Sequence, residues 1–422
     1  MEELLKKILA ILAKLTLWRY KPQIVGITGS VGKTSTKEAV AQVLRTNFTV
    51  RATPGNYNNE IGVPLTIINE HSAGRNGLIW LWVILKAVIK LIAVNYPKIL
   101  VLEIGTDRPG DIARLLDLIG TVNVGVLTDI GISHLEFFAH PQELAKEKLT
   151  LIKKLPRQST AILNFDNPKV LEGKNFTKAE IMGYGFSEQS NIIISDFQII
   201  DSAGTLGANF KIHHKGTVLP FFLPGVLGKP AAYAAAAAAA VGVKFNINLV
   251  AASEALKNYS SPPGRLRLIG GIKHTQIIDD TYNAAPDSTF AALETLVNIA
   301  RGRKLAALGG MAELGSKTDS GHREVAGKIM ESQVDQVFLV GENAKIIQDE
   351  LNKRKFSGRV FWFSTSDEAG IPIQNALIEG DTVLIKGSQS ARMEKIVKEI
   401  MAEPLLADTL LVRQSGSWNE RP

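Results

Sequence analysis

The chain has 422 residues, of which 45% are hydrophobic and 21% are charged, so its composition is globular and it is not mainly disordered. Its 48 Lys and Arg outnumber the 41 Asp and Glu, which gives a formal charge of +7. Because there is no cysteine, disulfide scaffolds, thiolate zinc sites, iron–sulfur clusters and cysteine nucleophiles are excluded. The sequence has no basic block, zinc finger or aromatic RNA-binding signature, and we expect no nucleic-acid partner.

Residues 1–20 are predicted to form an amphipathic helix. Apolar side chains recur at helical spacing with lysines between them: Leu4, Leu5, Ile8, Ile11, Leu12 and Leu15, with Lys6, Lys7 and Lys14. Glutamates come first, lysines interrupt the apolar run and no cleavage site of small residues follows. These features do not fit a secretory signal peptide.

A second apolar stretch, residues 78–94, lies in a predicted helical insertion at 77–95. It contains Lys86 and Lys90, whereas a membrane-spanning helix needs roughly 20 largely uncharged residues. Trp80, Trp82 and the two lysines suit a helix in a membrane interface. The other interpretation is a helix packed against the protein itself. We therefore expect a cytoplasmic protein, and the sequence leaves open a peripheral contact with the inner face of the membrane.

A glycine-rich loop joins a buried strand at 23–28 to an amphipathic helix, and it consists of Gly29, Ser30, Val31, Gly32, Lys33, Thr34 and Ser35. Glycines let backbone N–H groups close on phosphates, and the helix N-terminus adds positive potential. Lys33 can neutralise β- and γ-phosphates, and the Thr34 hydroxyl can ligate Mg²⁺. Ile27 stands where the strict pattern has glycine. The strand–loop–helix context nevertheless predicts a nucleotide-phosphate site.

Further candidates follow other buried strands. Glu103 ends a strand at 99–102, and ligands of open α/β sheets bind at the carboxyl ends of strands. It could hold Mg²⁺ or simply pair with a lysine. His134 lies in a loop past the strand at 122–127, a position that alone does not make it a ligand. Lys146 and Lys148 follow on a helix predicted to begin near Pro141.

Together these segments resemble the Mur ligases, ATP-dependent enzymes that add amino acids or a dipeptide to the peptidoglycan precursor. The motifs that carry the resemblance keep their order over about residues 22–400: 28–34, 55–66, 102–105, 131–136, 263–266, 279–288, 386–388 and 392–394. Asn-Tyr-Asn-Asn at 56–59 and Asp-Asp-Thr-Tyr-Asn-Ala at 279–284 favour the branch that adds D-alanyl-D-alanine to a UDP-N-acetylmuramoyl-tripeptide.

The resemblance implies an amide-bond ligase with ATP and Mg²⁺ as cofactors and small cell-wall precursors as substrates. ATP would convert the acceptor carboxylate to an acyl phosphate, an amine would attack, and ADP and phosphate would leave. Because both reactants are anionic, cations must lie between them. Thr34 and Glu103 match the family's first Mg²⁺ site, and His134 matches the second. Lys148 aligns with the lysine that the family carbamylates, with Lys146 as the rival assignment.

The resemblance also implies the other contacts. The catalytic set would be Lys33, His134, Lys148 and Arg265, with Arg265 reaching the ATP phosphates. The ribose and adenine would meet Asp280, Tyr282 and Asn283. The substrates would meet Asn56, Asn59, Lys386, Ser388 and Arg392, although the last three could equally be surface residues.

Three features depart from the family pattern. Only about 20 residues precede the loop, where full-length relatives have a domain that binds the uridine nucleotide, so recognition of that group is expected to differ. Pro230 and Ala231 stand where the family often has Gly-Lys-His-Asn contacts to ATP, and Gly310 stands where an Asp is common.

The predicted architecture is α/β throughout. Residues 21–262 are expected to form a P-loop ATPase domain with a mostly parallel sheet and a small antiparallel addition at 192–223. Residues 263–422 are expected to form a second, Rossmann-like doubly wound domain after a hinge at 261–264. We expect a monomer. Two alternatives remain open: a folylpolyglutamate-synthase-like ligase, and a nucleotide-binding partner subunit that does not ligate.

Overall fold

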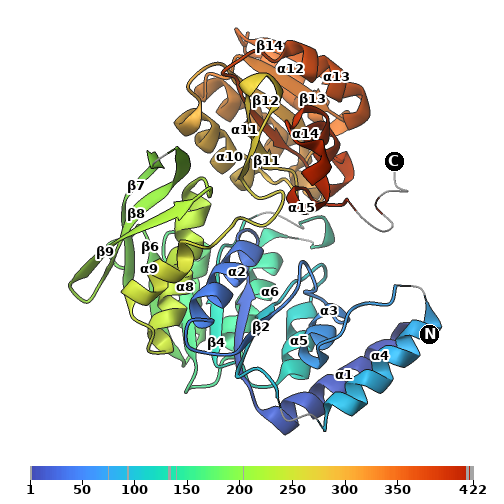
Figure 1. Cartoon of the computed structure of the whole chain (residues 1–422), viewed down its shortest axis with the longest axis vertical. Helices are drawn as coiled ribbons and strands as arrows, with labels where there is room; N and C mark the ends of the chain where they lie inside the picture. The colour runs from blue at the N-terminus through green and yellow to red at the C-terminus, as the bar shows by residue number, and fades with distance from the viewer. Residues whose placement is uncertain are drawn as a thin grey trace.

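The computed structural model describes residues 2–74, 76–92, 95–131, 135–138, 140–202, 204–414 and 418. Over these residues the strands form a nine-stranded sheet and a six-stranded sheet, each with helices packed against it. Figure 1 shows the six-stranded sheet in the yellow-to-red part of the chain, above the rest. The predicted α/β fold with large, mostly parallel sheets is confirmed.

The nine-stranded sheet has the order β2-β3-β1-β4-β5-β6-β7-β8-β9. Strands β1 to β7 pair in parallel, and β7, β8 and β9 form the antiparallel addition. The central strands β1, β3, β4 and β5 are almost wholly buried because helices cover both faces. The bounds are β1 (Gln23–Thr28), β2 (Val50–Ala52), β3 (Ile99–Glu103), β4 (Val124–Leu127), β5 (Thr160–Asn164), β6 (Glu180–Gly185), β7 (Ile192–Ser202), β8 (Thr205–His214) and β9 (Thr217–Pro224).

The helices that cover this sheet follow from its strand–helix alternation. They are α2 (Lys33–Leu44), α3 (Gly62–Ile68), α5 (Asp111–Ile119), α6 (Pro141–Lys153), α7 (Pro168–Leu171), α8 (Lys229–Lys244) and α9 (Leu249–Leu256). The alanine run at 234–240 is fully buried in α8, which packs against α2. Small side chains allow the two helices to approach closely.

Two helices lie side by side at one end of this unit (Figure 1): α1 (Glu2–Tyr20) and α4 (Gly77–Lys90). Helix α1 buries Leu9, Leu12 and Ala13 and contacts α3 and α5. Of the described residues of helix α4, only Val83 and Ala87 are buried. The helix therefore packs against the protein along a narrow strip, and most of its apolar surface is exposed. Among the described residues, no helix has the length and apolar character needed to cross a bilayer.

The six-stranded sheet has the order β10-β11-β15-β12-β13-β14, parallel except for β10. Its strands are β10 (Arg267–Gly270), β11 (Gln276–Asp280), β12 (Lys304–Gly309), β13 (Gln336–Val340), β14 (Arg359–Phe363) and β15 (Thr382–Lys386). Its helices are α10 (Pro286–Ile299), α11 (Thr318–Glu331), α12 (Lys345–Lys353), α13 (Ser366–Ala376), α14 (Glu394–Ile400) and α15 (Ala407–Leu410). The sequence predicts the other five strands, at 275–278, 304–308, 336–340, 360–363 and 381–385, and does not predict β10, a short strand at the sheet edge.

Candidate active site

A cavity of about 1110 Å³ is lined by residues of both units. One wall comes from the loop before α2, the 56–61 segment and the carboxyl ends of β3 and β4. The opposite wall comes from 264–266, 280–288, Glu313, Lys386 and Gln389. Both walls therefore lie where open α/β sheets bind their ligands.

The glycine-rich loop runs from β1 into α2 as predicted. Gly32 has a left-handed φ of 85° at the N-cap of α2, a conformation that favours glycine. A Cβ on Gly29 would lie 2.0 Å from Thr128 Oγ1, so only glycine lets the loop pack against the end of β4. The N-terminus of α2 points its backbone N–H groups toward the cavity, where they can bind an anion.

Two lysines meet behind this loop. Lys33 Nζ donates to Gly29 O at 2.7 Å, and Lys148 Nζ from α6 donates to the same oxygen at 3.1 Å. Lys148 is 1% exposed, and burial, followed by the neighbouring Lys33 charge, holds its pKa well below the usual value. Burial also lowers the pKa of Lys33. A lowered pKa favours the neutral, nucleophilic form of an amine.

Glu103 lies at the centre of a polar cluster beside the loop. It is 2% exposed, and its Oε2 accepts from Thr34 Oγ1 at 3.0 Å. Its Oε1 accepts from Asn58 Nδ2 at 3.0 Å. Lys37 Nζ lies 3.8 Å from Oε2 and donates to Gly55 O at 2.9 Å. Glu103 thus contacts the threonine and also pairs with a lysine. Sequence pattern predicts no role for Lys37, and Asn58 is part of the 56–59 motif without a role of its own.

Arg265 joins the two walls of the cavity. Its Nη2 donates to Thr34 Oγ1 at 3.0 Å, although the two residues are 231 positions apart. Its guanidinium carbon lies 4.1 Å from the centroid of the Tyr282 ring, a cation–π contact. This contact holds the guanidinium beside the start of α2.

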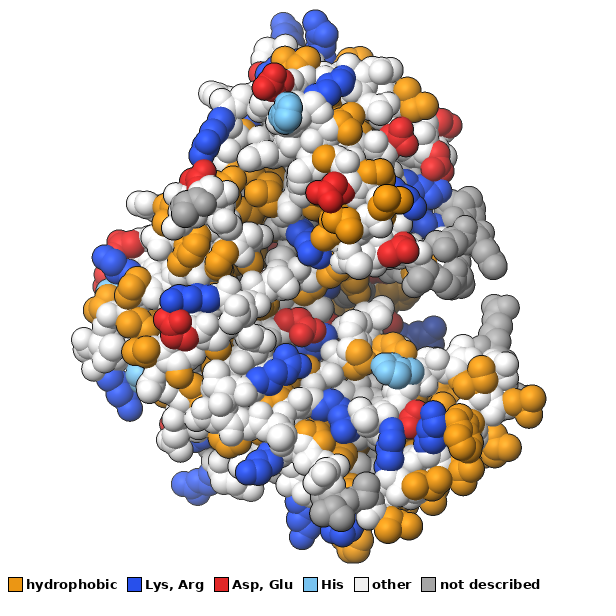
Figure 2. All heavy atoms as spheres, in the orientation of Figure 1, with side chains coloured by type: hydrophobic (Ala, Val, Ile, Leu, Met, Phe, Trp, Pro, Cys, Tyr) orange, Lys and Arg blue, Asp and Glu red, His pale blue; other side chains and the backbone are white. Residues whose placement is uncertain are grey.

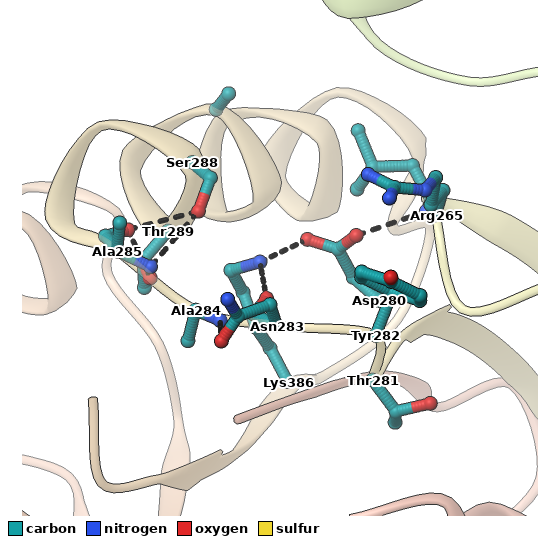
Figure 3. Close-up of polar contacts among 12 residues, drawn as sticks. Arg265, Asp280, Thr281, Tyr282, Asn283, Ala284, Ala285, Ser288, Thr289 and Lys386 are labelled. Carbon is teal, nitrogen blue, oxygen red and sulfur yellow. Dashed lines mark hydrogen bonds and ion pairs between the residues drawn. The ribbon is translucent and has the colours of Figure 1, made fainter. Parts of the chain in front are cut away.

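Figure 3 shows the polar contacts of the second wall. Asp280 Oδ2 pairs with Lys386 Nζ at 2.6 Å, and its Oδ1 accepts from Leu266 N at 3.2 Å. Lys386 also donates to Asn283 O at 2.8 Å. The neighbouring Asp279 is fully buried, and burial raises its pKa to about 6.

Comparison with protein families assigns both halves of the chain. Residues 264–389 match the Mur ligase glutamate ligase domain, and residues 27–79 and 83–242 match the Mur ligase middle domain. The chain belongs to the Mur ligase family.

Individual relatives agree with this placement. This Mur ligase is 31% identical over 396 residues to the UDP-N-acetylmuramoyl-tripeptide--D-alanyl-D-alanine ligase of Bacillus subtilis. The matched region covers 93% of this chain and 79% of the relative. The crystal structure of MurF ligase from Thermotoga maritima in complex with ADP matches 93% of this chain and 83% of its own, with 27% identity and a TM-score of 0.78. Escherichia coli FolC in complex with DHPP and ADP has 16% identity and a TM-score of 0.60, which shows a shared fold alone.

Most, but not all, of the predicted site residues of this Mur ligase line the cavity. The cavity is lined by Ser30, Val31, Gly32, Lys33, Thr34, Ser35, Asn56, Asn59, Glu103, Arg265, Asp280, Tyr282, Asn283 and Lys386. Gly29 and Lys148 are not among its lining residues, because Lys148 lies behind the loop. His134 lies outside the described residues.

Ser388 and Arg392 are also absent from the described cavity wall. Ser388 Oγ donates to Gly310 O at 2.6 Å, and Arg392 Nε donates to Glu394 Oε1 at 2.6 Å. Asn59 Oδ1 accepts from the Gly62 backbone at 2.9 Å and so helps to fix the start of α3.

Proposed function

We propose that this Mur ligase is an ATP-dependent ligase that joins D-alanyl-D-alanine to a UDP-N-acetylmuramoyl-tripeptide, with release of ADP and phosphate. The observation that carries the proposal is the convergence of Lys33, Thr34, Glu103 and Arg265 at one end of a cavity formed by two α/β units. Positive groups at that end suit the γ-phosphate and the acceptor carboxylate, two anions that must meet.

The proposal includes Mg²⁺, because the donor set fits it. Hydroxyl and carboxylate oxygens are the ligands Mg²⁺ prefers, and those of Thr34 and Glu103 lie 3.0 Å apart at the start of α2. When bound, Mg²⁺ would neutralise charge on the phosphates and the acceptor. Lys33 and the N–H groups of α2 would bind the phosphates, while Asn58 and Lys37 keep the Glu103 carboxylate in place.

We further propose that Lys148 carries a carbamate. Its neutral amine would attack CO₂: an N–C bond forms, one C=O π bond opens, and the nitrogen loses a proton to solvent. The resulting carbamate is an anion that, with His134, could hold a second Mg²⁺. The depressed pKa of Lys148 and its position behind the phosphate loop support this assignment. Lys146 is exposed on another face of α6, which favours Lys148 over its rival.

Arg265 would stabilise the charge of the transferring phosphoryl group, because it contacts Thr34 across the cavity. Tyr282 and Asn283 would flank the nucleoside. Asp280 would accept from the ribose once its pair with Lys386 opens. Asn56, Asn59 and Lys386 line the volume left for the substrates, and Ser388 and Arg392 would support that wall from behind.

We divide the chain into an N-terminal helix at 1–20, a central domain at 21–262 and a C-terminal domain at 263–422. ATP would bind between the two domains, which would close on a hinge at 261–264. Because the substrates are small molecules and ATP is the phosphoryl donor, we place the reaction in the cytoplasm. We expect a monomer.

The test is phosphate release in the presence of ATP and Mg²⁺. UDP-N-acetylmuramoyl-tripeptide with D-alanyl-D-alanine should release phosphate, and Lys33→Met should abolish the release. Folate with glutamate is the matched pair for the alternative ligase, whose support is a shared fold. Phosphate release with folate and glutamate, and not with the muropeptide pair, would show that the substrates are those of the alternative ligase. Absence of release with either pair would favour a non-ligating partner subunit, the reading suggested by Pro230 in the cavity wall.

A further inference from the structure

Helices α1 and α4 share an apolar surface that faces solvent. Figure 2 shows apolar side chains gathered at the end of the molecule where Figure 1 places these helices. On α1 four side chains are 44–73% exposed: Leu4, Ile11, Leu15 and Trp18. On α4 and the turn after it eight are 46–81% exposed: Leu78, Ile79, Leu81, Trp82, Leu85, Val88, Ile89 and Ile92. These twelve residues are named the α1–α4 face.

Polar contacts at both ends hold α4 in this orientation. The Asn76 side chain caps its N-terminus by accepting from two backbone N–H groups at 3.0 and 3.2 Å. At its other end Lys90 pairs with Glu70 at 2.6 Å, and the Tyr20 hydroxyl donates to Lys90 O at 2.7 Å. The exposure of so many large apolar side chains is therefore built into the fold. Patches of this kind mark interaction surfaces.

The charges around the α1–α4 face are mostly positive, and its nearest carboxylates, Glu2, Glu3 and Glu70, already contact Lys6 or Lys90. Residues 4–37 and 71–102 contain no Asp or Glu. The cations that accompany the face are Lys7, Lys14, Arg19, Lys21 and Lys86, and none of the five forms an ion pair within the described part of the chain. The ammonium of Lys86 lies 5.4 Å from the Trp82 ring centroid. Apolar side chains, indole rings and unpaired cations thus share one surface.

We propose that the α1–α4 face docks on an anionic lipid bilayer. Apolar side chains would enter the boundary between headgroups and acyl chains, and the cations would meet lipid phosphates. The 14 residues of α4 span about 21 Å, less than the ~30 Å hydrocarbon core, so the helix would lie along the surface.

The charge pattern favours a lipid bilayer over a second copy of the chain as the partner of the α1–α4 face. A two-fold interface through the same face would bring the five cations of one copy against those of the other. The twelve residues of the face include no carboxylate to offset that repulsion, and Glu2 and Glu3 beside it are paired with Lys6. Docking would also orient the cavity relative to the membrane, because Glu2 and Lys6 at the start of α1 lie in the cavity wall.

Vesicle flotation of the full chain tests the proposal. We expect it to float with vesicles of phosphatidylcholine mixed with phosphatidylglycerol, less so at high salt, and not with phosphatidylcholine alone. The variants Trp18→Ser/Trp82→Ser and Lys14→Glu/Lys86→Glu should each weaken binding by at least about tenfold. Matched controls elsewhere, Val250→Ser/Val297→Ser and Lys153→Glu/Lys178→Glu, should bind like the wild type.

The outcomes are decisive either way. The proposal is overturned by absence of flotation, by equal binding to neutral vesicles, or by test variants that bind like the controls. It is also overturned if sedimentation shows a dimer that dissociates in the face variants and persists when vesicles are added to the wild type. A second pair, Leu81→Ser/Leu85→Ser, guards against misfolding of the tryptophan variant, and the unfolding temperature of each variant is compared with the wild type. Ligation of soluble substrates is measured separately, so neither result depends on the other.

Discussion

Lys33 and Lys148 donate hydrogen bonds to a single carbonyl oxygen, that of Gly29, at 2.7 and 3.1 Å. Two amines so close together cannot both carry a proton at low cost in a buried place. Lys148 is the more buried of the two, and its pKa is the more strongly lowered. The contact with Gly29 O thus brings the two amines together, and the neutral form is favoured more strongly at Lys148, behind the loop, than at Lys33.

Removal of the Lys148 amine should stop catalysis with little effect on the fold. We expect Lys148→Ala to lose at least about a hundredfold in kcat, because a ligand formed on that amine is lost. Acetate or another short-chain acid should restore part of the rate, whereas bicarbonate should not. Lys146→Ala, two residues away and exposed, is the control and should match the wild type. Full activity of Lys148→Ala would remove the carbamate from the mechanism.

Glu103 should set the requirement for Mg²⁺. Glu103→Gln keeps the shape of the side chain and removes its charge, so the Mg²⁺ concentration for half-maximal phosphate release should rise by at least about tenfold. Glu38→Gln is the control, since Glu38 is a partly exposed carboxylate 3.1 Å from the same Lys37. A Mg²⁺ titration of both variants checks this. An unchanged requirement in Glu103→Gln would place the ion elsewhere.

Lys37 should matter for stability. It is fully buried, and it bridges Glu103 and the carbonyl oxygen of Gly55. In Lys37→Met the buried Glu103 carboxylate and the Gly55 carbonyl would each lose the lysine as a partner. The free energy of unfolding should therefore fall by about 2–4 kcal/mol. Urea titration measures the loss. Lys21→Met, at an exposed position, should change it by less than about 0.5 kcal/mol. Equal values for the two variants would contradict the structural role.

Arg413 should act on ATP binding through Tyr282. Its Nη1 donates to Thr281 O at 3.0 Å and pairs with Glu394 at 3.0 Å, and its Nη2 donates to Tyr282 O. We expect Arg413→Gln to raise the KM for ATP by about tenfold with kcat changed less than about twofold, because the backbone beneath the Tyr282 ring loses its anchor. Arg413→Lys should not restore the KM, since an ammonium lacks the planar fork. A fall in kcat alone would argue against this positioning role.

Asp279 should make stability depend on pH. Burial raises its pKa from 3.8 to about 6, so between these values the folded chain binds more protons than the unfolded chain. Unfolding free energy should therefore fall as pH rises through this window, by about 2 kcal/mol between pH 4.5 and pH 7. Urea titrations of the wild type and Asp279→Asn at both values check this. On going from pH 4.5 to pH 7 the wild type should lose about 2 kcal/mol relative to Asp279→Asn, whose side chain does not titrate. A difference between the two proteins that stays constant would show that Asp279 titrates normally.

Much of this Mur ligase could be predicted from local pattern. A glycine loop between a strand and a helix has few structural uses, and buried parallel strands are near-continuous apolar runs, so the loop at 29–35 and most strands were predicted correctly. Glu103 at a strand end followed from the same logic. What local pattern missed were partners that are distant in the chain. Lys37 reads as an exposed helix lysine until the 55–62 segment folds over it, and nothing near Arg413 in the sequence points to Tyr282.

The sequence by itself determined the α/β class, the phosphate loop and the identity of the chemical groups, because spacing along a strand or helix decides which way neighbouring side chains face. Tertiary structure alone decided that Lys148 shares an oxygen with Lys33, that Arg265 spans 231 positions to reach Thr34, and that α4 leaves its apolar side exposed. The physical reason is that pKa, ion pairing and exposure depend on which surfaces pack together. Packing of that kind joins segments that no short sequence window contains.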